Sequence, residues 1–424
     1  MTMTAADYPR LGERVFRTAL PNGLEVIVVS KPYHAKRYAF FATRYGGMDM
    51  RFRQNGVWQD TPAGIAHYLE HKMFDTEEGN ALQELAKNGA SENAFTSCST
   101  TAYYLTCTEK FYENLRILLR FVSVPYFTRE SVEKEQGIIA QEIRMVEDDP
   151  DWRVYANLMR CLYRESPVRV PVAGTVESIR SITPQTLYDC HRAFYTPSNM
   201  VLVCVGDMDP DRVAAEAEAI LPEAGGPAIA RDYGQEELRP AERAFSQTME
   251  VSMPMFLAGY KCPPPAEGEA RLRQSIIGDL ACDVLFGGSS PLYTRLYEEG
   301  AINGSLGGGF DQVPGAAYLF VGGDVKEPER VFEEISRQAK KLGEEGIDEE
   351  FYQQIRRASY GSMIRGLNSF EGIAIGMMNS RFGGYDYYRF PEIFDTVTRA
   401  DVEAFLRENI TPERAALSTI QPGA

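Results

Sequence analysis

A repeated segment is the feature that most constrains the fold of this chain. Residues 183–197 can be laid over residues 398–412, because Thr183 matches Thr398 and Thr-Pro closes both segments at the same offset. Each copy predicts a helix capped by its threonine, then a turn and an apolar strand, at 200–205 and at 415–420. Self-similarity at so long a period indicates two copies of one domain.

The length of the chain and its turn-forming residues indicate where the two copies meet. A chain of 424 residues is too long for a single hydrophobic core. Prolines and glycines cluster within 222–243, so we expect an N-terminal domain at 1–221, a linker at 222–243 and a homologous C-terminal domain at 244–424. Strands joined by short turns alternate irregularly with helices in each half. This pattern predicts an α+β fold, with a mixed β-sheet covered by helices on one face of each domain.

Two of the four histidines lie four residues apart, in the segment His67-Tyr-Leu-Glu70-His71. Thr61-Pro62 is typical of an N-cap followed by proline at the first helical position, and apolar residues recur at helical spacing through the segment. On a helix, His67 and His71 share one face and Glu70 lies beside them. Two imidazoles and a carboxylate in this arrangement predict a catalytic zinc site.

The third zinc ligand is less obvious, because a catalytic zinc ion usually has three protein ligands and a water. His34 lies in a polar stretch and His191 in an amphipathic helix, so we expect both to be surface or packing residues. A carboxylate is then the expected ligand. The helix predicted after Thr128 offers Glu135 and Glu142, which lie seven residues apart and therefore on one face. A solvated acidic face is the alternative interpretation of that helix.

Together these motifs resemble the pitrilysin/insulinase family of inverted-motif zinc peptidases, which includes the mitochondrial processing peptidase. The resemblance implies that His67, His71 and Glu142 bind zinc and that Glu70 is the general base. It implies that Glu135 supports the ligands from behind. It further implies two tandem homologous domains that enclose a chamber.

Two further segments bear on the substrate. Asn93, Ala94, Phe95 and Thr96 resemble the family's edge strand beside the zinc, which pairs with the substrate backbone. Taken alone, this segment is a turn followed by a short strand. Many family members also carry an arginine and a tyrosine in the C-terminal half; Arg295 is present here, but no tyrosine stands where one is expected, so no residue is assigned to that role.

Composition excludes some classes of function. The net charge of −16 argues against nucleic-acid binding, which needs a basic face, and is compatible with cationic peptide partners or simply with solubility. No apolar run approaches a membrane span, and the first residues do not form a signal peptide, so we expect no membrane partner. Seven scattered cysteines are typical of reduced thiols in a cytoplasmic protein.

The motif and the resemblance therefore predict a zinc-dependent endopeptidase, and the resemblance implies that it acts on short or unfolded peptides. Because no histidine follows His191, we expect one zinc ion per chain, held by the first half. The alternatives are a weakly active or non-catalytic subunit of a heterodimeric processing peptidase and, more distantly, a zinc hydrolase of non-peptide amides. The resemblance implies a homodimer, or a heterodimer with a related inactive chain. The natural substrate and the cleavage preference stay open.

Overall fold

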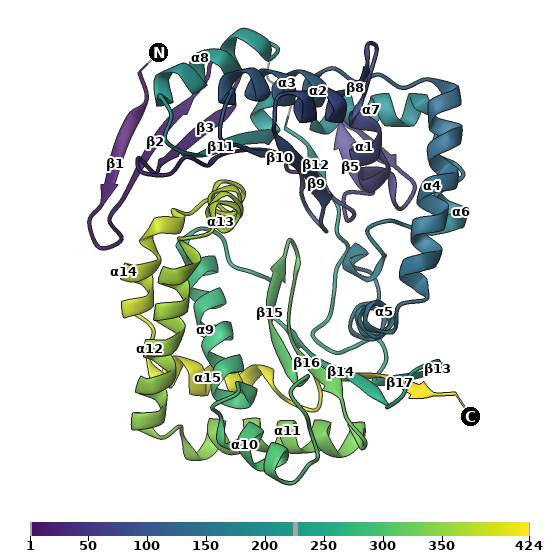
Figure 1. Cartoon of the computed structure of the whole chain (residues 1–424). Helices are drawn as coiled ribbons and strands as arrows, with labels where there is room; N and C mark the ends of the chain where they lie inside the picture. The colour runs from purple at the N-terminus through teal and green to yellow at the C-terminus, as the bar shows by residue number, and fades with distance from the viewer. Residues whose placement is uncertain (1, 224–227, 424) are drawn as a thin grey trace. The chain divides into compact units, whose positions relative to one another are not determined.

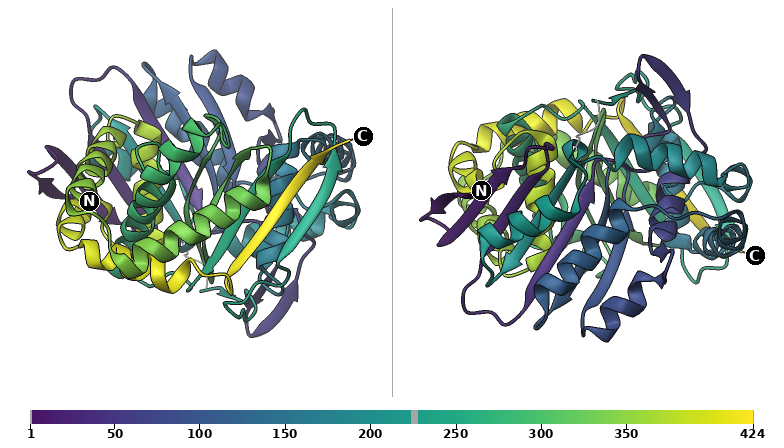
Figure 2. Two further views of the ribbon diagram at one scale, coloured as in Figure 1. Left: turned by 90° about the horizontal axis from the view of Figure 1, so that it is seen from below. Right: turned by 90° about the horizontal axis from the view of Figure 1, so that it is seen from above.

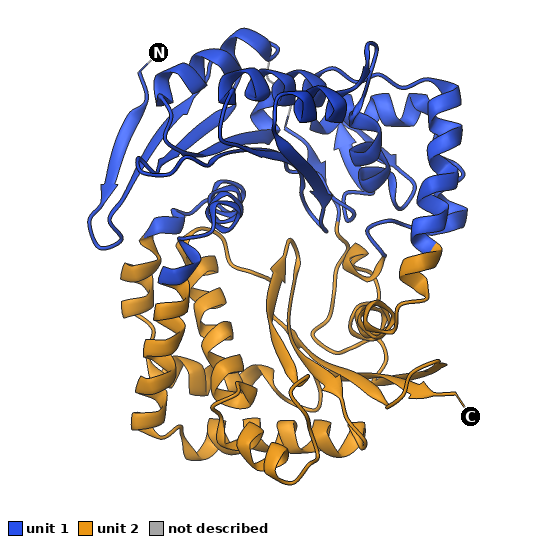
Figure 3. Ribbon diagram, viewed as in Figure 1, with its two compact units in different colours: residues 1–143, 171–232, 364–388 blue, residues 144–170, 233–363, 389–424 orange. Residues whose placement is uncertain are grey.

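Two units, each built around its own β-sheet, make up the computed structural model, which describes residues 2–223 and 228–423 (Figure 3). Unit 1 comprises residues 1–143, 171–232 and 364–388, and unit 2 comprises residues 144–170, 233–363 and 389–424. Each unit thus draws on both halves of the chain, whereas the domains expected at 1–221 and 244–424 are continuous. Residues 224–227 of the expected linker lie outside the described residues.

The sheet of unit 1 has seven strands in the order β1-β2-β3-β11-β4-β10-β9. Strands β3 and β11 run parallel and the other neighbours run antiparallel, so the sheet is mixed as expected. Strand β11 is buried at every position, which requires cover on both faces of the sheet. The strands are β1 (Thr4–Tyr8), β2 (Glu13–Ala19), β3 (Glu25–Ser30), β4 (Arg37–Thr43), β9 (Ser91–Thr96), β10 (Thr101–Cys107) and β11 (Met200–Gly206).

The sheet of unit 2 repeats this topology. Its order is β13-β17-β14-β16-β15, with β13 and β17 parallel and the other neighbours antiparallel. The order and the directions match β3-β11-β4-β10-β9, which confirms two homologous mixed sheets in an α+β fold. The strands are β13 (Ala244–Met249), β14 (Met255–Cys262), β15 (Gly307–Val313), β16 (Ala316–Asp324) and β17 (Ala415–Pro422).

Small sheets extend unit 1. A three-stranded sheet has the order β12-β5-β6 and a hairpin pairs β7 with β8. Their bounds are β5 (Arg51–Gln54), β6 (Val57–Asp60), β7 (Asp75–Thr76), β8 (Gly79–Asn80) and β12 (Ala230–Arg231).

Helices from the first half cover one face of the unit 1 sheet and bury a continuous apolar core there (Figures 1 and 2). They are α1 (Ile65–Met73), α2 (Ala81–Lys87), α3 (Phe111–Ser123), α7 (Pro184–Phe194) and α8 (Pro210–Ile220). Helices α4 (Arg129–Glu147) and α6 (Val176–Ile179) lie beside them, and the 3₁₀ turn η2 (Pro197–Asn199) precedes β11. The remaining elements are α9 (Glu269–Phe286), α10 (Pro291–Glu298), α11 (Pro328–Glu345), α12 (Glu349–Gly366), α14 (Phe390–Asp395), α15 (Arg399–Asn409), η1 (Pro167–Arg169) and η3 (Tyr387–Arg389).

Two helices pack on the sheet of the other half of the sequence. Helix α5 (Pro150–Leu162) lies against β13, β14 and β17 within unit 2, and α13 (Phe370–Gly383) lies against β4 and β11 within unit 1. Ion pairs fix α13 and the turn after it, from Arg381 to Glu25 at 2.8 Å and from Arg17 to Asp386 at 3.0 Å. Helix α13 thereby covers the central strands on the face that the first-half helices leave open (Figure 1).

The predicted repeat is confirmed, but one predicted helix start is wrong. Thr183 and Thr398 both close capping boxes, on α7 and α15, and strands β11 and β17 follow. Helix α1 begins at Ile65 rather than at Pro62, with Gly64 as its N-cap at φ 91°. A Cβ on Gly64 would lie 2.4 Å from the carbonyl oxygen of Ala173, so a distant segment sets this start, and only glycine fits there.

Candidate metal centre

Three side chains from two helices converge at the candidate metal centre. Helix α1 presents His67 and His71 with ring centroids 4.6 Å apart, and α4 presents Glu142. The carboxylate of Glu142 lies 3.4 Å from Nε2 of His67 and 3.5 Å from Nε2 of His71. One ligand atom from each residue lies within 4.8 Å of the other two. Two imidazoles and a carboxylate at this spacing fit a zinc ion with room for a water.

Burial and a hydrogen bond from Tyr68 help to hold the two helices together. The apolar side chains of α1 point into the core, which leaves the histidine face toward α4. The hydroxyl of Tyr68 on α1 donates a hydrogen bond to the carbonyl oxygen of Val132 on α4. Both groups are buried, so this bond helps to fix α1 relative to α4 and therefore the histidines relative to Glu142.

Glu135 lies on α4, about two helical turns before Glu142, and its carboxylate contacts the ring of His71. Its Oε1 is 3.0 Å from Nδ1 of His71, and the opposite ring nitrogen faces Glu142. A carboxylate that accepts from one ring nitrogen fixes the tautomer and makes the other nitrogen the better ligand. Burial works to lower the pKa of His71, but the bond to Glu135 and the charges of Glu70 and Glu142 raise it overall.

The carboxylate of Glu70 lies on the same side of α1 and is nearly buried. Burial raises its pKa above the usual range, and the hydrogen bond from Thr96 and the nearby histidines oppose that rise. Oε2 accepts from the hydroxyl of Thr96 at 2.5 Å. A carboxylate with a raised pKa that is held by a fixed donor suits proton transfer near neutral pH.

Strand β9 is the last strand of the unit 1 sheet, and among the described residues only β10 pairs with it. Asn93 accepts from the backbone N–H of Ala94 at 2.9 Å, and the ring of Phe95 lies 6.1 Å from that of Phe40. The outer edge of β9 therefore has no neighbouring strand in the described part of the chain, and the Asn93 side chain occupies one of its backbone N–H groups, that of Ala94. The hydroxyl of Thr96, a residue expected to contact the substrate through the strand backbone, donates to Glu70.

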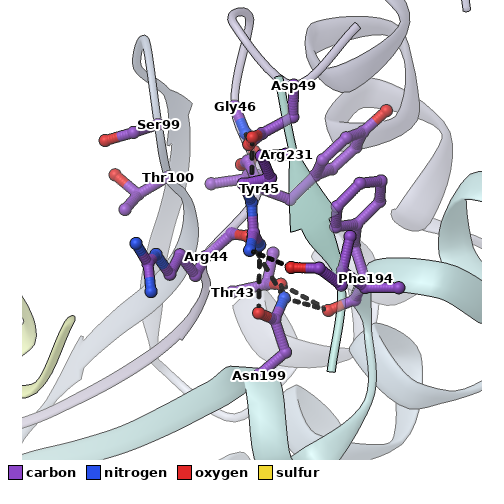
Figure 4. A network of polar contacts seen from close by, with 12 residues as sticks. Thr43, Arg44, Tyr45, Gly46, Asp49, Ser99, Thr100, Phe194, Asn199 and Arg231 are labelled. Carbon is purple, nitrogen blue, oxygen red and sulfur yellow. Dashed lines mark hydrogen bonds and ion pairs between the residues drawn. The ribbon is translucent and has the colours of Figure 1, made fainter. Parts of the chain in front are cut away.

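A buried network that the motif did not reveal anchors the turn after β9 (Figure 4). Nε of Arg231 lies 3.0 Å from the carboxylate of Asp49, which is 1% exposed, and the guanidinium also donates to the side chain of Asn199 at 3.1 Å. Asp49 accepts from the backbone N–H of Gly46 at 2.8 Å. The network thus fixes the loop at 44–50.

That loop in turn holds the end of the edge strand. Backbone N–H groups of Gly47 and Met48 donate to the carbonyl oxygens of Ser97 and Cys98 at 2.9 and 2.8 Å. A Cβ on Gly46 would lie 2.5 Å from the oxygen of Ser97, so glycine permits this approach. The Gly-Gly pair was a local signal for a close backbone contact. Arg231 carried no such signal, because it lies within the expected linker.

His191 and Arg295, both considered from the sequence, have partners other than His67, His71 and Glu142. His191 is buried with Nε2 at 3.1 Å from the carbonyl oxygen of Val122, and burial lowers its pKa to about 4, as a packing residue requires. Arg295 on α10 forms ion pairs with Glu299 at 3.2 Å and Glu334 at 2.7 Å.

Comparison with known proteins shows the family to which this chain belongs. A model described as insulinase (peptidase family M16) matches residues 54–176, and one described as the peptidase M16 inactive domain matches residues 181–359. The chain is 37% identical over 426 residues to YmfH, an uncharacterized zinc protease of Bacillus subtilis (strain 168), covering 98% of each chain. The chain belongs to the pitrilysin/insulinase family, peptidase family M16.

Solved structures share the fold. A protein named as an M16-like peptidase from Alicyclobacillus acidocaldarius superposes with a TM-score of 0.93 at 34% identity, covering 100% of this chain and 99% of that one. A protease from Helicobacter pylori superposes with a TM-score of 0.81 at 18% identity, covering 97% and 100%. Among the described helices, none is both long and apolar enough to cross a bilayer.

Proposed function

We propose that this protein is a zinc-dependent endopeptidase. The observation that carries the proposal is the convergence of His67, His71 and Glu142 within 4.8 Å, with Glu70 beside them. Relatives named as zinc proteases support the metal and the reaction class. Among the described residues, this is the one group of three such ligands close enough to share an ion, which supports one zinc per chain.

Zinc, when bound, supplies a Lewis acid that activates water and polarises a carbonyl near neutral pH. Glu70 accepts the proton of the attacking water and delivers it to the nitrogen of the leaving amine, as the C–N bond breaks. Thr96 holds the carboxylate of Glu70 at one oxygen, which leaves the other oxygen for the proton. Glu135 keeps the ring of His71 in the orientation that points Nε2 toward Glu142.

The free edge of β9 supports a preference for unfolded peptides. A peptide joins a sheet edge only as an extended segment whose backbone N–H and C=O groups are unpaired. We therefore assign the backbone of Asn93, Ala94, Phe95 and Thr96 to substrate binding, next to Glu70. Folded substrates lack such a segment, whereas short or unfolded peptides provide it.

One experiment tests the metal and the reaction together. Zinc content is measured by elemental analysis, and hydrolysis is measured with a quenched peptide library, on the wild type and on Glu142→Gln. We expect about one zinc per wild-type chain, and weaker zinc binding with lower activity in the variant, because a neutral amide is a poorer ligand. A folded wild-type sample without zinc after reconstitution would refute the metal site.

The same assay separates an enzyme from a non-catalytic subunit. A chain that retains zinc but hydrolyses no peptide alone, and gains activity when a related chain is added, would be one subunit of a heterodimeric peptidase. Retention of the ligands and of Glu70 supports activity of this chain itself. All seven cysteines are free thiols in the structure, which supports the proposed cytoplasmic location.

A further inference from the structure

A groove in unit 1 lies apart from the candidate metal centre. It has a volume of about 630 Å³ and is formed by the β7–β8 hairpin, helix α2, the end of α3 and the segment that follows α3. None of its lining residues is a metal ligand, Glu70 or part of strand β9. Its volume is in the range of sites that bind ligands.

The groove has an apolar lining that is partly open to solvent. Its floor is the nearly buried trio Ala81, Ile117 and Phe121. One wall carries Val124 and Tyr126, which are 65% and 37% exposed. Large apolar side chains that gather at a solvent-exposed hollow mark interaction sites more often than isolated ones do.

The rim of the groove is acidic. Glu77 and Glu78 extend from the hairpin and Glu84 from α2, against the single cation Arg120. All three glutamates are exposed, and within the described part of the chain no cation forms an ion pair with any of them. By contrast, Arg295, Arg330 and Arg337 form ion pairs with Glu299, just after α10, and with Glu334 on α11.

From this combination we propose that the groove is a second polypeptide-binding site, which takes a segment of a partner protein that combines Lys or Arg with large apolar side chains. The apolar partner side chains lie on Phe121 and against Tyr126, and the cations face the three glutamates. Apolar burial supplies affinity at such a site, and complementary charge selects the partner.

The test measures binding to the full-length Glu70→Gln chain, so that no probe is cleaved. The probe is a fluorescein-labelled octapeptide in which Lys alternates with Leu and Tyr, followed by fluorescence anisotropy at low salt. The counter-probe has Glu in place of each Lys. The groove variant is Glu77→Gln/Glu78→Gln/Glu84→Gln, and a second variant is Tyr126→Ala.

A matched control carries Glu329→Gln/Glu333→Gln/Glu350→Gln, three exposed glutamates on α11 and α12 of unit 2. It changes the net charge by the same amount as the groove variant. We expect roughly tenfold weaker binding of the Lys probe by the groove variant and by Tyr126→Ala, and less than about a twofold change for the control. The Glu probe should bind at least about tenfold more weakly than the Lys probe.

Equal losses in the two triple variants would overturn the proposal, because net charge alone would then explain binding. Equal binding of the two probes would overturn it as well. The binding assay requires no hydrolysis, so it can fail independently of the proposed function. If the wild type hydrolyses no peptide but the groove binds the Lys probe as expected, the peptidase function is refuted and the groove proposal stands. If the wild type hydrolyses peptides but the groove does not bind the probe as expected, the groove proposal is refuted and the peptidase function stands.

Discussion

The two halves of this chain share one strand order, but only the first half carries the residues of the candidate metal centre. Five strands in the same order are shared by the two sheets. Helix α1 is the first helix after the second of these strands in the first half, and α9 is the first helix after the second of them in the other half. Helix α4 corresponds in the same way to α12. Helix α1 carries His67, Glu70 and His71, whereas α9 carries Asp279 and Asp283 at the spacing of the two histidines and no histidine at all.

The difference separates the residues that maintain the fold from those that the proposed reaction requires. Both sheets depend on buried apolar strands and on the capping boxes of Thr183 and Thr398. The metal centre depends on a handful of side chains, which the second half lacks without any change in strand order. We therefore expect substitutions at the centre and at its counterpart to differ sharply in activity and little in stability.

The largest contrast is expected at the general base. Glu70→Gln should reduce peptide hydrolysis by about a hundredfold or more and leave zinc content unchanged, because proton transfer is lost and the ligands are kept. Asp283→Asn on α9, at the position that matches His71, is the comparison in the second half and should leave both unchanged. Turnover and bound zinc are measured on both variants, and a loss of similar size at Asp283 would break the contrast between the halves.

A smaller effect is expected behind the ligands. Glu135→Gln should lower zinc affinity by about ten- to a hundredfold, since His71 loses the partner that orients its ring. Glu133→Gln, an exposed neighbour on α4, is the control and should bind zinc as the wild type does. Competition with a zinc chelator measures both, and an unaltered affinity in Glu135→Gln would remove this role.

Substitution of Thr96 tests whether its hydroxyl positions Glu70 or contacts the substrate. Thr96→Val should lower kcat about tenfold with zinc retained, because a hydrogen bond to a charged group is lost at Glu70. Thr96→Ser should restore most of the rate. Steady-state kinetics give kcat and KM for the two variants. A rise in KM with kcat unchanged would contradict the role at Glu70 and support the substrate contact that the resemblance implies.

The smallest effects should be equal in the two halves. Thr183→Ala and Thr398→Ala each remove one capping box, and each should cost about 1 kcal/mol of unfolding free energy. Urea denaturation of the two variants measures this cost. A loss of unfolding free energy at only one site would mean that the two capping boxes do not stabilise their domains equally.

Local patterns in the sequence were sufficient for the repeat, its caps and the histidine pair, because each is determined by neighbouring residues. The α+β fold with two homologous sheets was also predictable from alternation and duplication. The start of α1 was not, since the carbonyl of Ala173 determines it through Gly64. Arg231 was equally hidden, because its partner Asp49 is nearly two hundred residues away in the chain. Nothing local indicates which sheet α5 and α13 cover.

The placement of α13 has a consequence for how the protein is made. Strand β11 ends at Gly206 and α13 begins at Phe370, so 370 − 206 = 164 positions separate the sheet from the helix that closes it. At about 5–20 residues per second, a ribosome takes roughly 10–30 seconds to cover that distance. During this interval the nascent first half exposes apolar strand faces, such as Phe40 and Val203, that the native fold buries. We therefore expect a chain truncated before α13 to leave this apolar face uncovered and to aggregate.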